Sequence, residues 1–556
     1  MFEARKGDGL YFLPLGGAGE IGMNLNLIGY GPPEAPSWLM IDCGVTFADE
    51  SMPGIDLVMP DPAFIEDRRE DLLAMVLTHA HEDHIGAVPY LWPRFRCPVY
   101  ATPFTGYLVR EKLKEVGLQD VVPLHIVPLG GSITLGPFTV ELVTLTHSIP
   151  EPNALAVRTP LGTIVHTGDW KIDPDPLIGE VTDEAGLRAL GDQGVLAMIC
   201  DSTNVFAPGR SGSEARVRDS LVDLIGTLKG RIAVTAFASN VARLESVAYA
   251  AARHGRHVVL VGRSMQRVVA AAKATGYLTE LSDFIDERDA GWLPPETVLY
   301  LCTGSQGEPR AALSRIATGT HPNVVLESGD TVIFSSRIIP GNEREIFAVQ
   351  SQLAARGIEV ITEQDELVHV SGHPCRDELA DMYRWVRPKI AVPVHGELRH
   401  LNEHVAFAQS LQIPKSLYAP NGSMIRLAPG PATIVDEVPH GRLYRDGLNL
   451  FAEGYSALRD RRRLAACGLV SAVLVLSAKG KLATEPAISL HGVAAPDEPD
   501  LIDTLHDIVE DVLAREVGRE WANDEFIAEM TRRALRRAIN KAVGVKPEAK
   551  VQILRI

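Results

Sequence analysis

The sequence predicts an α/β protein, and three observations lead to that fold class. Several short apolar runs have the composition of buried strands, and each ends directly in a group of polar residues. Residues 215–367 alternate between helical and strand-like spacing. Residues 466–556 contain a strand, two helices and a final strand, which predicts a small α+β domain. At 556 residues the chain is long for a single core, so we expect two to four domains.

Residues 11–30 are predicted to form two strands joined by a glycine-rich turn. Gly17, Gly19 and Gly22 match the spacing of a dinucleotide-binding turn. That motif requires a helix after the glycines, whereas residues 24–28 alternate polar and apolar side chains as a strand does. We therefore exclude a dinucleotide site here. A further short strand ends in Asp42, Cys43 and Gly44.

The densest group of polar side chains is the segment Thr-His-Ala-His-Glu-Asp-His at residues 78–84, which follows an apolar strand-like run. His79 and His81 face the same way in an extended chain, while a turn lets Asp83 and His84 approach from a second direction. Imidazole and carboxylate groups hold Zn²⁺ or Mn²⁺ while leaving a position open for water. The segment therefore predicts two metal ions. A loop of solvated histidines is the alternative, but this density of ligand types is rare by chance.

Three more candidate metal ligands follow strand-like runs later in the chain. They are His147, Asp169 and His395. Taken singly, each is more typical of a surface or turn residue. Together with the four residues of the first segment they make seven candidate metal ligands. Asp169 has two carboxylate oxygens and is suited to bridge two ions. Asp201 ends another buried strand.

Composition limits the classes of function. Hydrophobic residues make up 46% and charged residues 22%, as in ordinary globular proteins. No apolar run reaches the ~18 residues of a membrane span, and the first residues lack the apolar segment of a signal peptide. The six cysteines are scattered, which is typical of reduced thiols, so we expect a cytoplasmic protein without membrane contact. The net charge of −17 means that any nucleic-acid contact needs a local basic surface.

The alternating region at 215–367 predicts a small α/β domain with a parallel sheet. Its strand ends carry Ser, Thr, Gly and Arg, which can hold phosphates through backbone N–H groups and hydroxyls. Helix caps have the same composition and are the alternative. Phe237, Ala238 and Ser239 stand at one such end, and Phe237 offers a face for base stacking.

The last part of the chain is predicted to hold a strand at 470–476, helices from Asp500 to about Val517 and at 523–543, and a strand at 551–556. Arginines 459 and 461–463 suggest a basic connector before it. Four arginines share one face of the second helix: Arg532, Arg533, Arg536 and Arg537. A solvated charged face is the simpler interpretation, and contact with RNA or a partner subunit is the other.

In chain order the ligand types read H-x-H-x-D-H, a later histidine, a later aspartate and a C-terminal histidine, a pattern that resembles the metallo-β-lactamase fold family. The stretch between Asp201 and His395 is similar to the β-CASP insertion of that superfamily. A closer resemblance, to the ribonuclease J family, rests on further segments: GGAGEIG at 16–22, TAFASN at 235–240, VGRSM at 261–265, TGSQGEP at 303–309, IPGNE at 339–343 and HVSGH at 369–373. It covers roughly residues 8–450 and is looser beyond.

The resemblance implies a metallo-β-lactamase αββα sandwich with an inserted β-CASP α/β domain and a small C-terminal α+β domain. The expected bounds are 1–214 and 368–450 for the two parts of the sandwich, 215–367 for the insertion, 451–465 for a linker and 466–556 for the C-terminal domain.

The resemblance also implies residue roles. One ion would be held by His79, His81 and His147 and the other by Asp83, His84 and His395, with Asp169 bridging them; the ions would be Zn²⁺, or else Mn²⁺. His373 would donate a proton to the leaving oxygen, Asp201 would orient it, and Asp83 belongs to the catalytic set. The residues expected to bind substrate are Phe237, Ala238, Ser239, His369, Val370, Ser371, Gly372 and His373.

The implied activity is that of a two-metal ribonuclease that degrades 5′-monophosphorylated single-stranded RNA from its 5′ end and also cleaves internally, in RNA decay and in rRNA and mRNA processing. The implied assembly is a homodimer or a dimer of dimers. Three alternatives remain. A small-molecule metallohydrolase has no use for so long an insertion, and a non-catalytic scaffold would have lost ligands that are all present here. A DNA-directed β-CASP nuclease is the nearest alternative.

Overall fold

The computed structural model describes residues 5–49, 51–495, 498–515 and 522–556. The chain divides into two compact units. The first comprises residues 1–46 and 59–442, and the second comprises residues 47–58 and 443–556. We describe each unit by itself.

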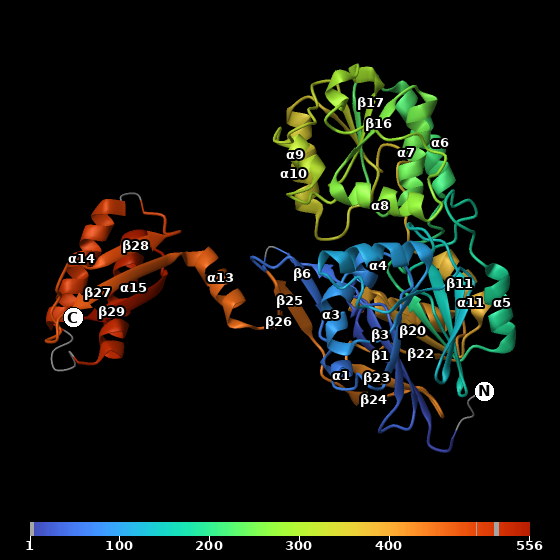
Figure 1. The fold of residues 1–556 in the computed structure, drawn as a ribbon, viewed down its shortest axis with the longest axis horizontal. Helices are drawn as coiled ribbons and strands as arrows, with labels where there is room; N and C mark the ends of the chain where they lie inside the picture. Colours follow the sequence, from blue (N-terminus) through green and yellow to red (C-terminus); the bar gives the residue numbers. More distant parts are fainter. Residues whose placement is uncertain (1–4, 50, 496–497, 516–521) are drawn as a thin grey trace. The chain divides into compact units, whose positions relative to one another are not determined.

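The first unit contains two large sheets that face each other (Figure 1). The first sheet consists, in spatial order, of β24 (Thr433–Glu437), β23 (Ser423–Ala428), β1 (Gly9–Gly16), β3 (Leu25–Gly31), β4 (Ser37–Ile41), β7 (Leu72–Val76), β8 (Val99–Ala101) and β9 (Leu124–Ile126). The second consists of β10 (Ser132–Leu135), β11 (Phe138–Thr144), β12 (Asn153–Thr159), β13 (Gly162–His166), β14 (Ala197–Asp201), β20 (Ile390–Val394) and β22 (Lys415–Ser416).

Alternate residues of the strands fill the space between the two sheets. Phe12, Ile28 and Ile41 of the first sheet share one buried cluster with Leu155 and Ile199 of the second. This pattern follows from the two-residue period of strands, which sends every second side chain to the same face. Strands with apolar residues at successive positions are therefore covered on both faces.

Helices cover the outer face of each sheet and complete the αββα sandwich (Figure 1). They include α1 (Ala63–Glu66), α3 (Val88–Phe95) and α4 (Pro103–Glu115) on the first sheet, and α5 (Glu184–Gln193), α11 (Arg376–Val386) and α12 (Leu398–Ser410) on the second. The predicted fold class is confirmed.

The insertion leaves the second sheet after β14 and returns before β20. Its sheet is entirely parallel, as predicted, with the order β16 (His257–Val261), β17 (Val298–Cys302), β15 (Ile232–Thr235), β18 (Thr331–Phe334) and β19 (Glu359–Ile361). Its helices include α6 (Glu214–Thr227), α7 (Val241–Arg253), α8 (Arg263–Ala274), α9 (Ala312–Ala317) and α10 (Glu343–Ala355). Between the strands the chain crosses over through these helices, as parallel pairing requires.

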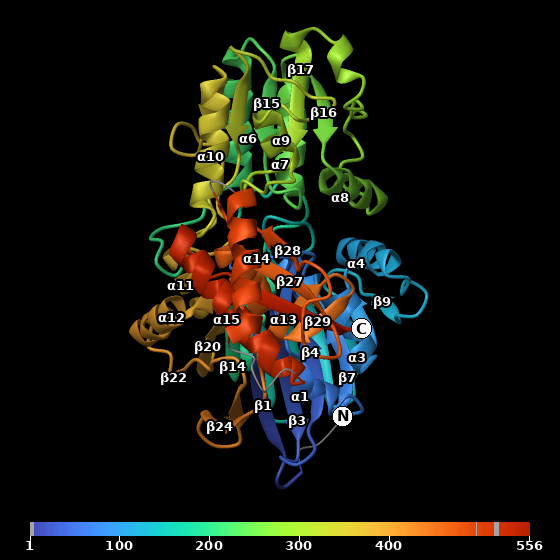
Figure 2. The ribbon, with the colours of Figure 1, turned by 90° about the vertical axis from the view of Figure 1, so that its left-hand side faces the viewer.

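The second unit has a three-stranded sheet with two helices on one face (Figures 1 and 2). The strands are β28 (Ala487–His491), β27 (Leu469–Leu476) and β29 (Glu548–Arg555), and the helices are α14 (Glu498–Arg515) and α15 (Asp524–Val543). Alternate residues of β27, among them Val470 and Leu474, pack on Leu505 and Leu535 of the helices. The predicted end of the first helix at Val517 lies outside the described residues.

The segment expected as a linker, 451–465, contains the end of β26 (Asn449–Ala452) and most of helix α13 (Ser456–Cys467). Arg461 of this segment is anchored within the unit: it pairs with Asp446 and donates to the carbonyl of Pro53. A small sheet of β26, β25 (Arg442–Asp446), β6 (Leu57–Pro60) and β5 (Thr46–Phe47) explains why residues 47–58 belong to this unit.

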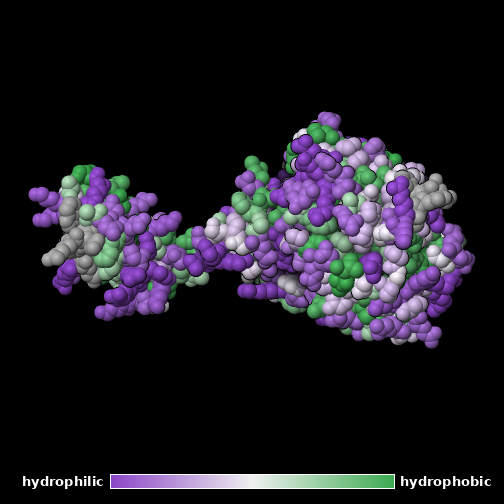
Figure 3. Space-filling model, turned by 90° about the horizontal axis from the view of Figure 1, so that it is seen from below, coloured by the Kyte–Doolittle hydropathy of each residue, from purple (hydrophilic) through white to green (hydrophobic). Residues whose placement is uncertain are grey.

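Hydrophilic residues dominate the face seen in Figure 3, and hydrophobic residues occur there in small separate groups. No helix in the described part of the chain combines the length and the apolar character that crossing a membrane requires.

Candidate metal centre and active site

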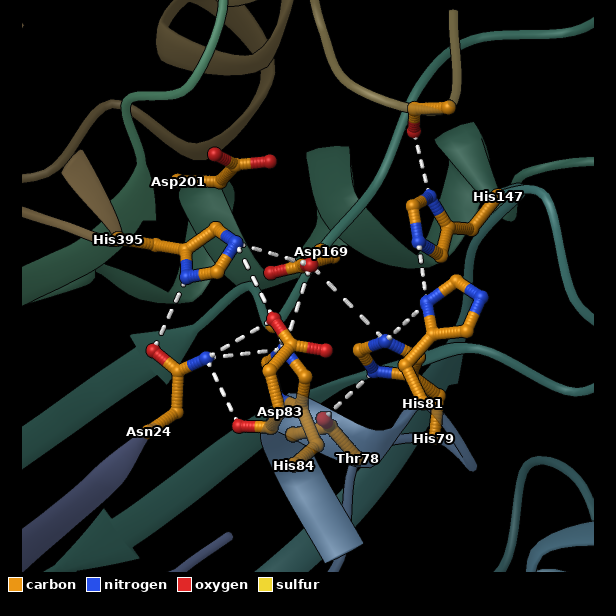
Figure 4. Close-up of polar contacts among 12 residues, drawn as sticks. Asn24, Thr78, His79, His81, Asp83, His84, His147, Asp169, Asp201 and His395 are labelled. Atoms are coloured by element: carbon orange, nitrogen blue, oxygen red, sulfur yellow. Dashed lines mark hydrogen bonds and ion pairs between the residues drawn. The ribbon is translucent and has the colours of Figure 1, made fainter. Parts of the chain in front are cut away.

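The ends of neighbouring strands bring the predicted ligands to one place. β13, β14 and β20 are adjacent and parallel, so their carboxyl ends meet at the same edge of the second sheet. Asp169 follows β13, Asp201 ends β14 and His395 follows β20, while β7 of the first sheet runs toward His79. The other six predicted ligands gather around Asp169 (Figure 4). Ligand sites at the carboxyl ends of strands are a general feature of α/β folds.

The three-histidine group consists of His79, His81 and His147, with Asp169 beside it. Nδ1 of His81 lies 3.1 Å from Nε2 of His79 and 3.0 Å from Nε2 of His147. Nδ1 of His147 donates to the carbonyl of Gly372, which leaves its Nε2 as the nitrogen that faces the group. Three ring nitrogens therefore converge on one point.

Nδ1 of His79 lies 3.0 Å from the Thr78 hydroxyl, which itself donates to the Asp42 carboxylate at 2.9 Å. The hydroxyl oxygen thus accepts from His79, and Nε2 of His79 carries a lone pair toward the other rings. Burial lowers the pKa of His79 and His147 well below the usual value, and that of His81 to about 4. Neutral imidazoles whose lone pairs converge repel one another, and they are the form that binds metal ions, so this group fits a divalent cation.

The second group consists of Asp83, His84 and His395, and Asp169 belongs to it as well. Oδ2 of Asp169 lies 3.2 Å from Nε2 of both His84 and His395, and Oδ2 of Asp83 lies 3.4 and 3.6 Å from the same nitrogens. Asp169 is thus common to both groups, and its role as a bridging carboxylate stays a prediction.

Electrostatics differ between the two groups. Burial alone lowers the pKa of His395, but Asp169, Asp201 and Asp83 together raise it to about 9. Burial raises the pKa of Asp169, but His395 and His84 hold it well below its usual value. The carboxylates thus attract positive charge to this point. A divalent ion satisfies the same demand once the ring nitrogens are deprotonated, so the second group also fits a metal ion.

Two residues behind the ligands were not assigned a role from the sequence. Asp42 is fully buried and accepts hydrogen bonds from the Thr78 amide at 2.8 Å, the Thr78 hydroxyl, and Nδ1 of His84 at 2.7 Å. Asn24 accepts from Nδ1 of His395 at 3.0 Å and donates to the carbonyl of Asp83 at 3.1 Å. Such contacts fix ring orientation and tautomer in metal sites. Asp42 ends a strand, as the predicted ligands do, and that signal was available in the sequence.

We expect Asp42→Asn to lower the affinity for added Zn²⁺ by about tenfold to a hundredfold, the usual cost of losing a group that orients metal ligands. An amide cannot accept from both Thr78 and His84 in the way that two carboxylate oxygens do. Competition with a chromophoric chelator measures the affinity, and the exposed Asp436→Asn is the control. Equal affinities would show that Asp42 serves the fold alone.

A histidine and aspartate pair lies beside the metal ligands. Nδ1 of His373 is 2.7 Å from Oδ2 of Asp201, whose other oxygen accepts from the Thr203 amide at 2.8 Å and hydroxyl at 2.7 Å. Burial alone lowers the pKa of His373, but Asp201 and Asp169 together raise it, so the net shift is upward. Nδ1 of His373 also lies 3.9 Å from Oδ2 of Asp169. The same two residues also form a possible ligand group with Asp169 and His395.

The segment before His373 approaches the three-histidine group closely. A Cβ atom at Gly372 would lie 2.8 Å from the Ser148 hydroxyl oxygen and 2.9 Å from Cε1 of His147, so only glycine allows this approach. The Ser371 hydroxyl accepts from the His373 amide at 3.1 Å and from Nδ2 of Asn204 at 2.7 Å.

The other residues predicted to bind substrate have fewer contacts with the candidate metal ligands. Val370 is buried, and the pKa of the partly buried His369 lies well below its usual value because of burial and the nearby Arg243, Lys171 and Arg337. Phe237, Ala238 and Ser239 form the partly exposed turn between β15 and α7. Within the described residues, none of these last three makes a side-chain hydrogen bond to the histidines.

Four family models match successive parts of the chain. They are described as metallo-beta-lactamase superfamily (residues 37–218), ribonuclease J beta-CASP domain (229–353), Zn-dependent metallo-hydrolase RNA specificity domain (357–414) and ribonuclease J C-terminal domain (456–556).

Relatives match along most of their length. A ribonuclease J of Sinorhizobium meliloti is 46% identical over 556 residues, which is 100% of this chain and 99% of the relative. That of Thermus thermophilus is 39% identical over 83% of this chain and 82% of its own. A crystal structure of a protein of unknown function from Enterococcus faecalis matches 75% of this chain and 100% of its own, with a TM-score of 0.51 and 17% identity, and this likeness concerns the fold alone.

The matched domains follow the order that the structure shows, and the relatives extend across both of its units. Their ribonuclease and metallo-hydrolase descriptions agree with a site in which histidines and aspartates gather at the carboxyl ends of strands. The chain therefore belongs to the ribonuclease J family, whose members are metal-dependent hydrolytic ribonucleases.

Proposed function

We propose that this ribonuclease removes nucleotides one at a time from the 5′ end of single-stranded RNA, prefers a 5′-monophosphate, and also cleaves internally, in RNA decay and in rRNA and mRNA processing. The observation that carries the proposal is the position of Ser371 and His369 on the same short segment as His373, directly beside the metal ligands. A terminal phosphate held there lies within a fixed distance of the reacting bond.

The three-histidine group and the second group, which share Asp169, would hold two divalent ions. Such ions would supply Lewis acidity that activates water near neutral pH and offsets charge on phosphate oxygens. His373 gives its proton to the departing 3′ oxygen. Asp201 holds the His373 ring through Nδ1, so Nε2 is the nitrogen left to donate. Thr203 in turn fixes the Asp201 carboxylate.

The groups around Ser371 suit a phosphate. The Ser371 hydroxyl oxygen already accepts two hydrogen bonds, so its hydrogen is left to donate. The exposed Arg337 guanidinium donates to Oδ1 of Asn204, the residue that also holds Ser371. Arg337 therefore supplies local positive charge in a chain whose net charge is −17.

We expect 5′-monophosphorylated RNA to be degraded from its 5′ end to nucleoside 5′-monophosphates, and 5′-triphosphorylated RNA to resist. A triphosphate brings more bulk and more charge than the groups around Ser371 can hold. The product ladder from 3′-labelled RNA with each 5′ end measures the preference. Equal rates for the two ends, or digestion that starts at the 3′ end, would reject the phosphate site and leave the metal chemistry standing.

Ser371→Leu should weaken the preference for a monophosphate, because the larger side chain fills the space beside Asn204 and removes the hydroxyl. Ser410→Leu, at the exposed end of α12, is the matched control. DNA of the same sequence, labelled in the same way, tests the alternative of a DNA-directed nuclease. Three further properties stay predictions: zinc or manganese as the native metal, assembly as a homodimer or a dimer of dimers, and a cytoplasmic location.

A further inference from the structure

One buried carboxylate joins three segments of the active site. Glu378, in the first turn of α11, is 0% exposed. Its Oε1 accepts from the Ile172 amide at 3.0 Å and the Ser211 hydroxyl at 2.7 Å, and its Oε2 accepts from the Ser211 amide at 2.9 Å and the Cys375 amide at 2.8 Å. Both oxygens are thus fully used, and the donors come from places far apart in the sequence.

Each of these segments carries a residue of the proposed reaction. Ile172 lies three residues after Asp169, and Cys375 lies two residues after His373. Ser211 belongs to the loop that leads from Asp201 to helix α6. A shift of Glu378 therefore changes the spacing between the proposed acid, the aspartate that orients it, and the aspartate shared by the two metal groups.

The start of α11 reinforces the same arrangement. The Arg376 amide donates to the carbonyl of Ala207 at 3.0 Å, and the Asp377 amide donates to that of Gly209 at 3.1 Å. These amides are among the donors that a helix N-terminus leaves unused by the helix itself. The loop that follows Asp201 is thus held by the helix backbone and by Glu378 together.

Burial of a carboxylate costs free energy because the charged group loses its contact with water. Such a group must be fully hydrogen-bonded to be tolerated, and an apolar side chain of similar volume avoids that cost. No ion pair within the described residues includes Glu378, so the four hydrogen-bond donors are the direct contacts that satisfy its charge. In exchange, the four hydrogen-bond donors of Glu378 hold the three segments in one fixed geometry.

We propose that Glu378 is a positioning residue, which sets His373 at its working distance from Asp169 by clamping the loops that carry them. This inference rests on the proposed function. Glu378 contacts neither the phosphate nor a metal ligand, and it acts through the backbone of Ile172, Ser211 and Cys375.

The clamp itself is tested without any activity. In Glu378→Gln an amide NH₂ replaces one carboxylate oxygen and faces donors instead of accepting from them. Amide hydrogen exchange should accelerate by about tenfold or more at 172 if the NH₂ replaces Oε1, or at 211 and 375 if it replaces Oε2, because local opening becomes easier. Asp381→Asn is the matched control, since Asp381 stands on the same helix and pairs with Arg210 of the same loop. Exchange rates equal to those of the control would overturn the clamp.

The consequence for the reaction is tested by kinetics on 5′-monophosphorylated RNA. Glu378→Gln should lower kcat by about 10²-fold with little change in KM, since small misplacements of catalytic groups cost that much. A substrate with a 3′-phosphorothiolate leaving group, which needs no proton, should show a smaller deficit. Equal deficits on the two substrates, or a kcat like that of Asp381→Asn, would overturn the role in positioning His373.

Ser211→Ala is a milder variant for the case that Glu378→Gln fails to fold. It removes only the Ser211 hydroxyl donor and leaves the Glu378 carboxylate intact. It should show the same pattern at a smaller size, and wild-type kinetics together with wild-type exchange would contradict the clamp. Wild-type protein that leaves RNA uncut would reject the proposed function, whereas the exchange rates would still decide whether Glu378 clamps the loops.

Discussion

Asp169→Asn should abolish RNA hydrolysis and lower the amount of bound metal. Asp169 is common to both groups of candidate ligands, and its Oδ2 lies 3.2 Å from the ring nitrogens of both His84 and His395. Asparagine keeps the shape but removes the charge and one acceptor oxygen. The rings that face it then lack the group that would join two ions, and the chemistry that needs both is lost.

Metal content by elemental analysis and turnover on labelled RNA are measured on the same purified protein. Asp192→Asn changes an exposed carboxylate of α5 in the same way and should leave both quantities unchanged. Near-normal turnover in Asp169→Asn would remove the basis for a two-metal centre.

His373→Ala should retain the metal and lose on the order of 10²–10⁴ in rate, the usual contribution of a general acid or base. The ring is held 2.7 Å from Asp201 and close to Asp169, which is the placement that proton donation to the leaving oxygen requires. RNA with a 3′-phosphorothiolate at the scissile bond should recover much of the loss because a thiolate leaves without a proton.

Metal analysis separates this role from ligation. Asp201, His373, Asp169 and His395 also form a possible ligand group, so a metal loss as large as that of Asp169→Asn would make His373 a ligand. Asp201→Asn should reproduce the rate loss with metal retained, because the amide no longer accepts from His373 in the same way while Thr203 stays in place.

The parts of the site that the sequence predicts are those encoded by local spacing. The seven candidate ligands either crowd into residues 78–84 or follow apolar runs. Parallel pairing of β13, β14 and β20 brings two of the latter, Asp169 and His395, to one edge of the sheet. The parallel sheet of the insertion and the strand, helix, helix and strand of the second unit follow from periodicity in the same way.

Asn24 and Glu378 were not predicted because their contacts span long distances in the sequence. Asn24 contacts His395, 371 residues away, and Glu378 contacts Ile172, 206 residues away. Neither lies in a motif that carries chemistry. Residues 47–58 likewise join the second unit only because β6 pairs there in a sheet with β25, which periodicity does not indicate.

Reconstitution of metal-free protein tests the central claim most directly. Zn²⁺ or Mn²⁺ is added in known amounts while cleavage of 3′-labelled, 5′-monophosphorylated RNA is followed. The two-group site predicts that activity is absent in chelator and reaches its maximum only with the second equivalent of metal, with products that shorten from the 5′ end. Full activity in chelator, or a maximum at the first equivalent, would contradict a centre in which Asp169 joins two ions.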